Sequence, residues 1–113
     1  MPRDQEALVD ILEAIKLILQ YSAGQDFDAL AANVEKQDAI LRRITIIGEA
    51  TKRLSPAFRL QHPAVPWKQM AGMRDVITHD YDEIDLDDVW GVIQRDLPQL
   101  LTDIEPLVAN NQP

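Results

Sequence analysis

The sequence predicts an all-α protein, a bundle of four to five helices. Apolar residues recur at spacings of three and four residues over most of the chain, no alternating strand pattern is present, and residues that begin or end helices separate the apolar segments. The 113 residues fit one domain, residues 1–113, with a single hydrophobic core. The chain contains no cysteine, which excludes disulfides and thiolate chemistry.

The first helix is predicted over residues 4–22, with Asp4 as its N-cap and Gly24 just beyond its end. Its apolar residues share one face, which we expect to be buried. These residues are Leu8, Ile11, Leu12, Ile15 and Leu19.

A second helical region covers residues 25–36, breaks near residues 33–36 and continues over residues 37–54. One face of the continuation is apolar and consists of Ile40, Ile44, Ile47, Thr51 and Leu54. Leu41 and Ile46 widen this surface beyond one stripe, as expected for a helix packed on two sides or in an oligomer, and we predict a homodimer. Gly48 costs about 1 kcal/mol relative to alanine in mid-helix, and such a glycine often lets another backbone approach closely.

A short helix is predicted next, with Ser55 as its cap and Pro56 in its first position. Pro63 and Pro66 then require an extended connector. From there the pattern predicts one helix over residues 67–79.

Residues 80–88 read as a polar turn, in which Asp85 or Asp87 caps the last helix. That helix is predicted over residues 88–108, with a kink at Pro98. No segment is long and apolar enough to predict a membrane span, and the acidic N-terminus is unlike a secretory signal. We therefore expect a cytoplasmic protein.

The net charge of −8 is unevenly distributed. Residues 36–74 hold eight basic residues against two acidic ones, a net charge of +6, and the remainder holds three against seventeen, a net charge of −14. The basic middle segment is compatible with nucleic-acid binding, although charged helix faces often serve only solubility. Both interpretations stay open at this point.

The stretch "MAGMRDVITHDYDE" places Arg74, Asp75, His79 and Tyr81 close together near the end of a predicted helix. On a straight helix, Arg74 and Tyr81 share a face, whereas His79 lies about 140° away from Arg74. One helix therefore aims Arg74 and His79 at a single atom only if the chain turns back or a second copy completes the site.

Arginine and histidine together suit RNA cleavage by the ribose 2′-hydroxyl. Histidine can accept or donate a proton near neutral pH, and arginine holds phosphate oxygens and stays charged. A purely structural role at the polar end of a helix is the alternative.

Metal sites are poorly supported, and we expect no metal or other cofactor. A calcium loop that begins at Asp80 would lack a ligand at Ile84, the central glycine, and the final carboxylate, because Gly91 stands at that position. A zinc site would need His62 and His79 together with distant acids. His62 is more consistent with packing in a loop, and Trp67 and Trp90 with anchors in a core or interface.

The segment "RDVITHDY" resembles the motif of HEPN-domain ribonucleases: an arginine, a polar residue, three further residues, a histidine, one residue and a tyrosine. The segments "IIGEATKRLS", "HPAVPWKQMAGMRDVITHDY" and "DVWGVIQRDLPQLLTDI" resemble, in order and spacing, the HepT-like toxins of this superfamily. The resemblance covers nearly the whole chain and is strongest over residues 38–105.

The resemblance implies a HEPN-like helical bundle that forms a homodimer, with the motifs of two protomers in one cleft. Arg74 and His79 would be the ribonuclease pair, and Asp75 stands at the supporting polar position, where asparagine is common. Tyr81 matches the tyrosine that an antitoxin, a minimal nucleotidyltransferase of the MntA type, modifies with AMP. The "IGEA" segment, with Gly48, Glu49 and Thr51, would pack helices and support the cleft.

Two functions from different classes follow. The first is the toxin of a type VII toxin–antitoxin system, a metal-independent endoribonuclease that AMPylation of Tyr81 silences. The alternative is a catalytically idle HEPN dimer that acts as the binding partner of a minimal nucleotidyltransferase. A purely structural helical dimer would leave the position of Tyr81 unexplained.

Overall fold

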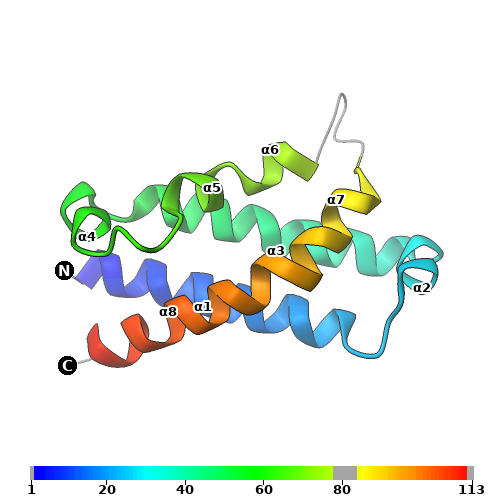
Figure 1. Cartoon of the computed structure of the whole chain (residues 1–113), viewed down its shortest axis with the longest axis horizontal. Coiled ribbons are helices and arrows are strands. Elements are labelled where there is room, and N and C mark those ends of the chain that lie inside the picture. Colours follow the sequence, from blue (N-terminus) through cyan, green and yellow to red (C-terminus); the bar gives the residue numbers. More distant parts are fainter. Residues whose placement is uncertain (1, 78–83, 112–113) are drawn as a thin grey trace.

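Three long rods dominate the computed structural model, which describes residues 2–77 and 84–111. They are α1 (Pro2–Ser22), α3 (Val34–Arg53) and a third rod made of α7 (Leu86–Gly91), η2 (Val92–Asp96) and α8 (Leu97–Asn111). α1 and α3 lie side by side, and the third rod crosses them obliquely (Figure 1). The described residues form helices and no strand, which confirms the predicted all-α class.

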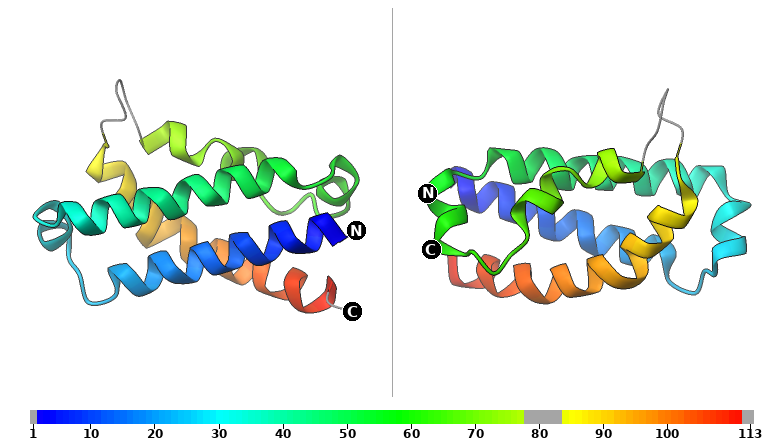
Figure 2. Two further views of the ribbon diagram at one scale, coloured as in Figure 1. Left: turned by 180° about the vertical axis from the view of Figure 1, so that it is seen from behind. Right: turned by 45° about the horizontal axis from the view of Figure 1, so that its top comes forward.

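Four short helices complete the bundle. α2 (Phe27–Ala31) connects α1 to α3 at one end of the molecule. α4 (Pro56–Gln61) turns the chain at the other end, and α5 (Trp67–Ala71) and α6 (Met73–Ile77) run back along α3 (Figure 2). None of the helices in these two ranges has the length and apolar character that crossing a membrane requires.

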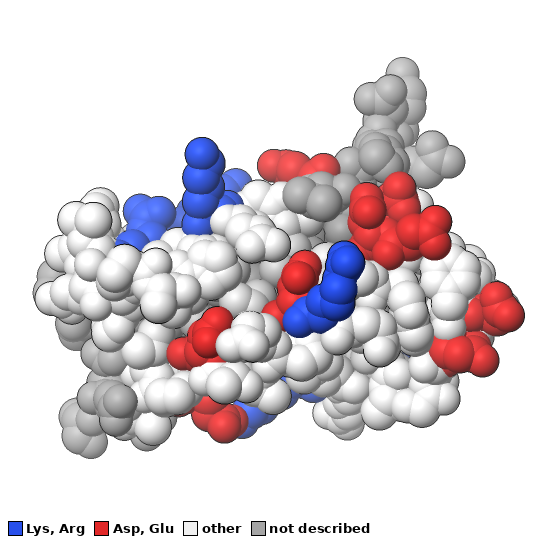
Figure 3. Space-filling model, viewed as in Figure 1, with Lys and Arg blue, Asp and Glu red and all other residues white. Residues whose placement is uncertain are grey.

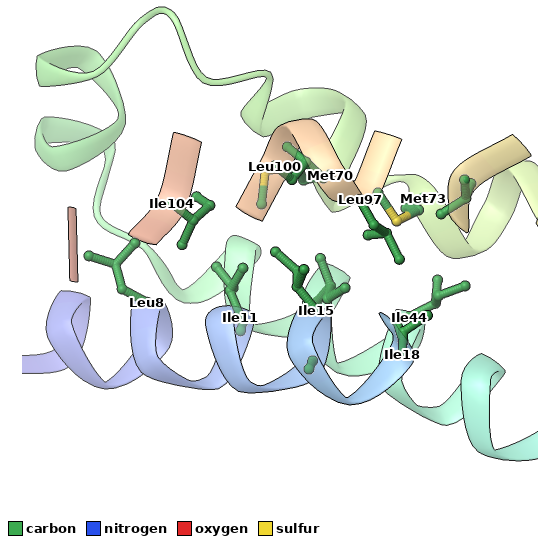
Figure 4. Packing of buried hydrophobic residues seen from close by; sticks show 14 of the residues in the cluster. Leu8, Ile11, Ile15, Ile18, Ile44, Met70, Met73, Leu97, Leu100 and Ile104 are labelled. Atoms are coloured by element: carbon green, nitrogen blue, oxygen red, sulfur yellow. The ribbon is translucent and has the colours of Figure 1, made fainter. Parts of the chain in front are cut away.

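The predicted apolar face of α1 forms one wall of the core. Leu8, Ile11 and Ile15 are fully buried, whereas Leu12 and Leu19 are only partly buried at its margin. Figure 4 shows the α1 side chains pointing toward the third rod and α5. The facing side chains are Met70, Leu97, Leu100 and Ile104.

Asp4 is not the N-cap of the first helix, because α1 already includes Pro2. The side chain of Asp4 is instead 4% exposed and accepts hydrogen bonds from the Ser55 backbone N–H (2.7 Å) and hydroxyl (2.8 Å). It therefore connects the start of α1 to the loop before α4. The predicted helix end is confirmed, since Gly24 follows α1 with a positive φ of 74°.

The predicted break before the central helix is confirmed at Asn33. Its side chain accepts a hydrogen bond from the Lys36 N–H (3.0 Å) and caps α3. The predicted apolar face of α3 is buried throughout and consists of Ile40, Ile44, Ile47, Thr51 and Leu54. Leu41 and Ile46 are half-buried and pack against the margin of the core.

The connection from α3 to α5 follows the predicted pattern. Ser55 caps α4 by accepting a hydrogen bond from the Phe58 N–H (3.1 Å), with Pro56 as the first helical residue. His62 packs its ring on Phe58, with ring centroids 4.6 Å apart, which confirms its expected role in loop packing. The buried Trp67 donates from its indole nitrogen to the carbonyl oxygen of His62 (2.9 Å).

The prediction of a single helix over residues 67–79 is wrong in one respect. Gly72 ends α5, with its N–H directed at the carbonyl oxygens of Lys68 and Met70, and α6 then begins at Met73. Glycine has the lowest helix propensity after proline, so the interruption falls where a helix is least stable. The described part of α6 extends to Ile77, and His79 lies outside the described residues.

The last rod begins slightly earlier than predicted and is irregular just before Pro98. Asp85 is the N-cap, and its carboxylate accepts from the Asp88 N–H (3.1 Å), which settles the choice between Asp85 and Asp87. In η2 the Leu97 N–H donates to the carbonyl oxygen of Val92, five residues earlier. Proline lacks an N–H and crowds the preceding turn, so a wide turn at this place is expected.

Candidate functional site

The backbone of α3 approaches the end of α5 closely at Gly48. A Cβ atom at this glycine would lie 3.2 Å from the carbonyl oxygen of Ala71 and 3.7 Å from that of Met70. The prediction that another backbone approaches Gly48 is therefore confirmed. The contact fixes the point at which the chain leaves α5 and enters α6.

Two methionines hold this segment to the core. Met70 is fully buried and Met73 is 3% exposed. Between them the chain turns at Gly72, whose carbonyl oxygen accepts a hydrogen bond from the Asp75 N–H (3.0 Å). Because Met73 faces the core, its neighbour Arg74 leaves α6 at another angle and is half-buried.

Arg74 lines a surface pocket of about 350 Å³ between α3 and the α5–α6 segment. The pocket contains two basic and two acidic side chains, one hydroxyl and a floor of small residues. Its lining consists of Thr45, Gly48, Glu49, Lys52, Ala71, Arg74 and Asp75. Two cations that line one open pocket can bind a phosphate, and the guanidinium of Arg74 can do so with paired N–H donors.

The structure thus brings together Arg74, Asp75, Gly48 and Glu49, which the sequence motifs assign to one cleft. Thr51 packs helices but does not line the pocket. It is fully buried, and its hydroxyl donates to the carbonyl oxygen of Ile47 (2.7 Å).

Among the α3 residues that line the pocket, sequence reasoning missed two, Thr45 and Lys52. Their signal is spacing: Thr45, Gly48, Glu49 and Lys52 recur at intervals of three and four residues along α3. The close backbone approach predicted at Gly48 could have indicated that the residues three and four positions away on the same helix line the same site.

His79 and Tyr81 lie outside the described residues, so the structure places neither of them. Their roles remain predictions from the motif. In sequence, the segment that contains them directly follows α6, the helix that carries Arg74.

The two signs of charge gather on different parts of the surface. Figure 3 shows a group of Lys and Arg side chains at the edge formed by α4 and α5, and Asp and Glu side chains around α7 and the α2 end. On this face, the polarity seen in the sequence is therefore visible between the α4–α5 edge and the α7 end. A polyanion would approach the basic side more favourably than the acidic end.

Comparisons with known proteins agree with the family resemblance of the sequence. The model of the family described as "Ribonuclease HepT-like" matches residues 11–107. The "Probable ribonuclease HepT" of Thermococcus cleftensis is 36% identical over 103 residues, which cover 91% of this chain and 94% of that protein. No solved structure matches the chain.

A longer relative shares the region as part of a larger protein. The "Gamma-glutamylcyclotransferase and putative RNase" of Methanocaldococcus jannaschii is 42% identical over 94 residues, which cover 83% of this chain and 42% of the relative. The chain therefore spans less than half of that protein. The chain belongs to the HepT-like ribonuclease family, whose enzymatic class is endoribonuclease.

Proposed function

We propose that this chain is a cytoplasmic ribonuclease toxin of a type VII toxin–antitoxin pair. It cleaves RNA with Arg74 and His79, at a site shared across a homodimer. The observation that carries the proposal is the pocket in which Arg74 and Lys52 stand together, directly before the segment that contains His79. Membership in a ribonuclease family supports RNA as the substrate of this pocket.

Arg74 binds the scissile phosphate in this mechanism. Negative charge grows on the phosphate oxygens as the phosphorane forms, and a guanidinium that remains protonated stabilises this charge. The neighbouring α3 side chains complete the pocket that receives the phosphate.

His79 supplies the proton transfers. It accepts the proton of the ribose 2′-hydroxyl while the 2′-oxygen bonds to the adjacent phosphorus. The bond from phosphorus to the 5′-oxygen breaks, and His79 of the partner subunit donates a proton to that oxygen. The products are a 2′,3′-cyclic phosphate and a free 5′-hydroxyl, and the reaction needs no metal ion.

Regulation acts on Tyr81. A minimal nucleotidyltransferase antitoxin of the MntA type transfers AMP to the tyrosine hydroxyl and releases pyrophosphate from ATP. The added phosphodiester places a negative charge and a bulky nucleoside close in sequence to Arg74, where they compete with RNA.

Asp75 favours a second candidate, in which the dimer is catalytically idle and serves as a partner of the nucleotidyltransferase. Its exposed carboxylate lines the pocket of Arg74 and adds a negative charge where phosphate would bind. Cleavage of RNA by the purified protein, lost on mutation of Arg74, separates the two candidates.

The direct test is RNA cleavage by Arg74→Ala and His79→Ala variants. Each should fold like the parent and lose activity by about 10²-fold or more, since Arg74 stabilises the charge of the phosphorane and His79 moves a proton in the transition state. Lys16→Ala is the matched control, because Lys16 is basic and exposed but lies on α1, outside this pocket and outside the basic edge of α4 and α5. Full activity of a folded Arg74→Ala variant would reject the proposal.

A further inference from the structure

One continuous segment of the chain, residues 50–74, contains no aspartate or glutamate. The segment has a net charge of +5, whereas the rest of the chain holds six basic residues against nineteen acidic ones, a net charge of −13. Its five basic residues are Lys52, Arg53, Arg59, Lys68 and Arg74. A chain that is strongly acidic elsewhere does not need this separation of charges in order to stay soluble.

The fold brings two of these cations to one edge of the molecule. Phe58 of α4 and Trp67 of α5 pack with their ring centroids 6.0 Å apart. Arg59 and Lys68 directly follow these two aromatic residues in sequence, so both belong to the edge at which α4 meets α5. Figure 3 shows Lys and Arg side chains gathered there. We call the surface that contains Arg59 and Lys68 the basic edge.

The two cations of the basic edge have no acidic partner within the described part of the chain. The ion pairs of the described residues are formed by other cations, such as Arg53 with Asp10. Lys68 is exposed, and Arg59 is half-buried, with a buried Nε that donates to none of the described residues. A buried donor without an acceptor costs free energy, so packing alone is a poor reason for an arginine at this position. The charge of Arg59 remains available to an anion from outside the chain.

The basic edge continues toward the pocket of Arg74. Lys68 and Ala71 are three residues apart on α5, so they lie on the same side of this helix, about 5 Å apart along its axis. Ala71 lines the pocket of Arg74. A phosphate bound by Lys68 would therefore lie about one helical turn from that pocket.

An open hollow of about 710 Å³ lies along the same part of α5. Its lining includes Val65, Pro66 and Trp67, next to Lys68. An apolar surface beside a cation suits a single strand, whose unpaired bases can contact the apolar side chains while its phosphates face the charge. A duplex keeps its bases paired and stacked, so the combination favours single-stranded RNA.

We propose that the basic edge binds phosphates of single-stranded RNA next to the scissile one, with Arg59 and Lys68 as positioning residues. The strand passes from the pocket of Arg74 along α5 to α4. An acidic protein would also be attracted by these charges, but RNA carries a phosphate at every nucleotide, and the edge is continuous with the pocket of the substrate. The inference deepens the proposed function and rests on it for the scissile phosphate.

The first experiment measures how the full chain binds a labelled single-stranded RNA with 2′-O-methyl riboses, which lacks the attacking hydroxyl and stays intact. The logarithm of the affinity falls with the logarithm of the salt concentration, with a slope of about −0.7 for each phosphate contact on a single strand. Arg59→Ala and Lys68→Ala should each make this slope shallower by about 0.7 and weaken binding severalfold at low salt. Lys68→Arg keeps the charge and should bind like the parent.

Two control variants remove one positive charge elsewhere. Lys16→Ala on α1 and Arg95→Ala in η2 match the two test variants in residue type. Arg95 lines a different pocket, together with the carboxylates of Asp96 and Asp103, which repel a polyanion. Both controls should keep the slope of the parent. Circular dichroism checks the fold of every variant, and the exposed Lys68 provides a test that does not depend on the folding of Arg59→Ala.

Cleavage kinetics on a long RNA provide the second readout. Loss of either cation of the basic edge should raise KM severalfold and leave kcat within about twofold, since the edge holds substrate and transition state equally. Arg74→Ala should instead lower kcat. A purely structural role of the edge would lower kcat in proportion to the loss of folded protein and leave KM unchanged.

A salt slope that is unchanged in both Arg59→Ala and Lys68→Ala overturns the inference. Variants that bind RNA like the parent but are no longer modified by the nucleotidyltransferase overturn it too, and would assign the basic edge to an acidic protein partner. A parent that binds the RNA through the basic edge but cleaves no RNA would reject the proposed function and leave the basic edge as an RNA-binding surface.

Discussion

Gly48 of α3 lies against the carbonyl oxygen of Ala71, at a distance that leaves almost no room for a side chain. This relationship places the end of α5 against α3 at Gly48, and with it Arg74 beside Thr45 and Lys52. The position of the candidate site therefore depends on a backbone contact between two residues that carry no reactive group.

Replacement of this glycine should displace α5. In Gly48→Val the new Cβ would stand 3.2 Å from a backbone oxygen that cannot rotate away, so we expect destabilisation of about 1–3 kcal/mol despite the better helix propensity. Urea unfolding measures the stability, and RNA cleavage should fall by more than the loss of folded protein explains.

Gly72→Ala provides the control for this variant. The nearest atom to its Cβ, the carbonyl oxygen of Lys68, is 3.7 Å away, an ordinary contact, so stability should stay within about 1 kcal/mol of the parent. A Gly48→Val protein that is as stable and as active as this control would show that α5 does not pack tightly against Gly48.

Asp4 should contribute more to stability than an exposed aspartate. Asp4→Ala leaves the N–H and hydroxyl of Ser55 without their buried acceptor, at a cost of about 1–3 kcal/mol. Asp10→Ala, which removes the half-exposed ion pair with Arg53, should cost less than about 1 kcal/mol. Equal losses in urea unfolding for the two variants would contradict the role assigned to Asp4.

Local signals predicted much of this fold. Ser55, Asn33 and Asp85 cap the helices that follow them, because a short polar side chain satisfies N–H groups only two or three residues further on. The buried face of α3 follows from the spacing of its apolar residues alone. These features need no knowledge of the rest of the chain.

Features that depend on distant residues were missed. Asp4 and Ser55 are 51 positions apart in sequence, so the hydrogen bonds between them leave no local pattern. Lys52 joins the pocket only because α6 returns over α3 after the interruption at Gly72. The motif predicts a role for Arg74, whereas the residues that line the pocket with Arg74 are brought there by tertiary packing.

Asp75→Asn should raise RNA cleavage. The exposed carboxylate of Asp75 lines the pocket of Arg74 and repels the substrate phosphate, while an amide of the same size does not. For an exposed charge we expect about a two- to fivefold increase, equivalent to about 0.5–1 kcal/mol. Initial rates on one RNA at two salt concentrations measure it, and the gain should shrink at high salt.

Asp103→Asn removes an equal charge from α8, outside this pocket, and should leave the rate unchanged. An unchanged rate in Asp75→Asn as well would show that the carboxylate does not act on the substrate.

Cleavage should proceed in excess EDTA and leave a 2′,3′-cyclic phosphate. In the proposed mechanism histidines move both protons and Arg74 stabilises the phosphorane, so no step uses a metal ion. Digestion of a short labelled RNA, with product ends identified by mass spectrometry, checks both statements. Activity that disappears in EDTA and returns with magnesium would reject this chemistry.

The last prediction concerns Tyr81, which the motif assigns to regulation. Its sequence neighbours are Asp80, Asp82 and Glu83, which are typical of a solvated segment rather than of a core, so its hydroxyl should be reachable by an enzyme. AMP on this hydroxyl would carry an anionic phosphodiester that can pair with the guanidinium of Arg74 and exclude RNA.

Tyr81→Phe should therefore fold, retain most of its ribonuclease activity and escape the antitoxin. Mass spectrometry after incubation with the cognate nucleotidyltransferase and ATP should find AMP on the parent and none on the variant. Tyr21→Phe, the only other tyrosine replacement that the chain offers, is the matched control and should be modified and silenced like the parent. AMP on Tyr81→Phe would show that another residue is modified. A parent that stays unmodified and active would show that this enzyme is not regulated by AMPylation.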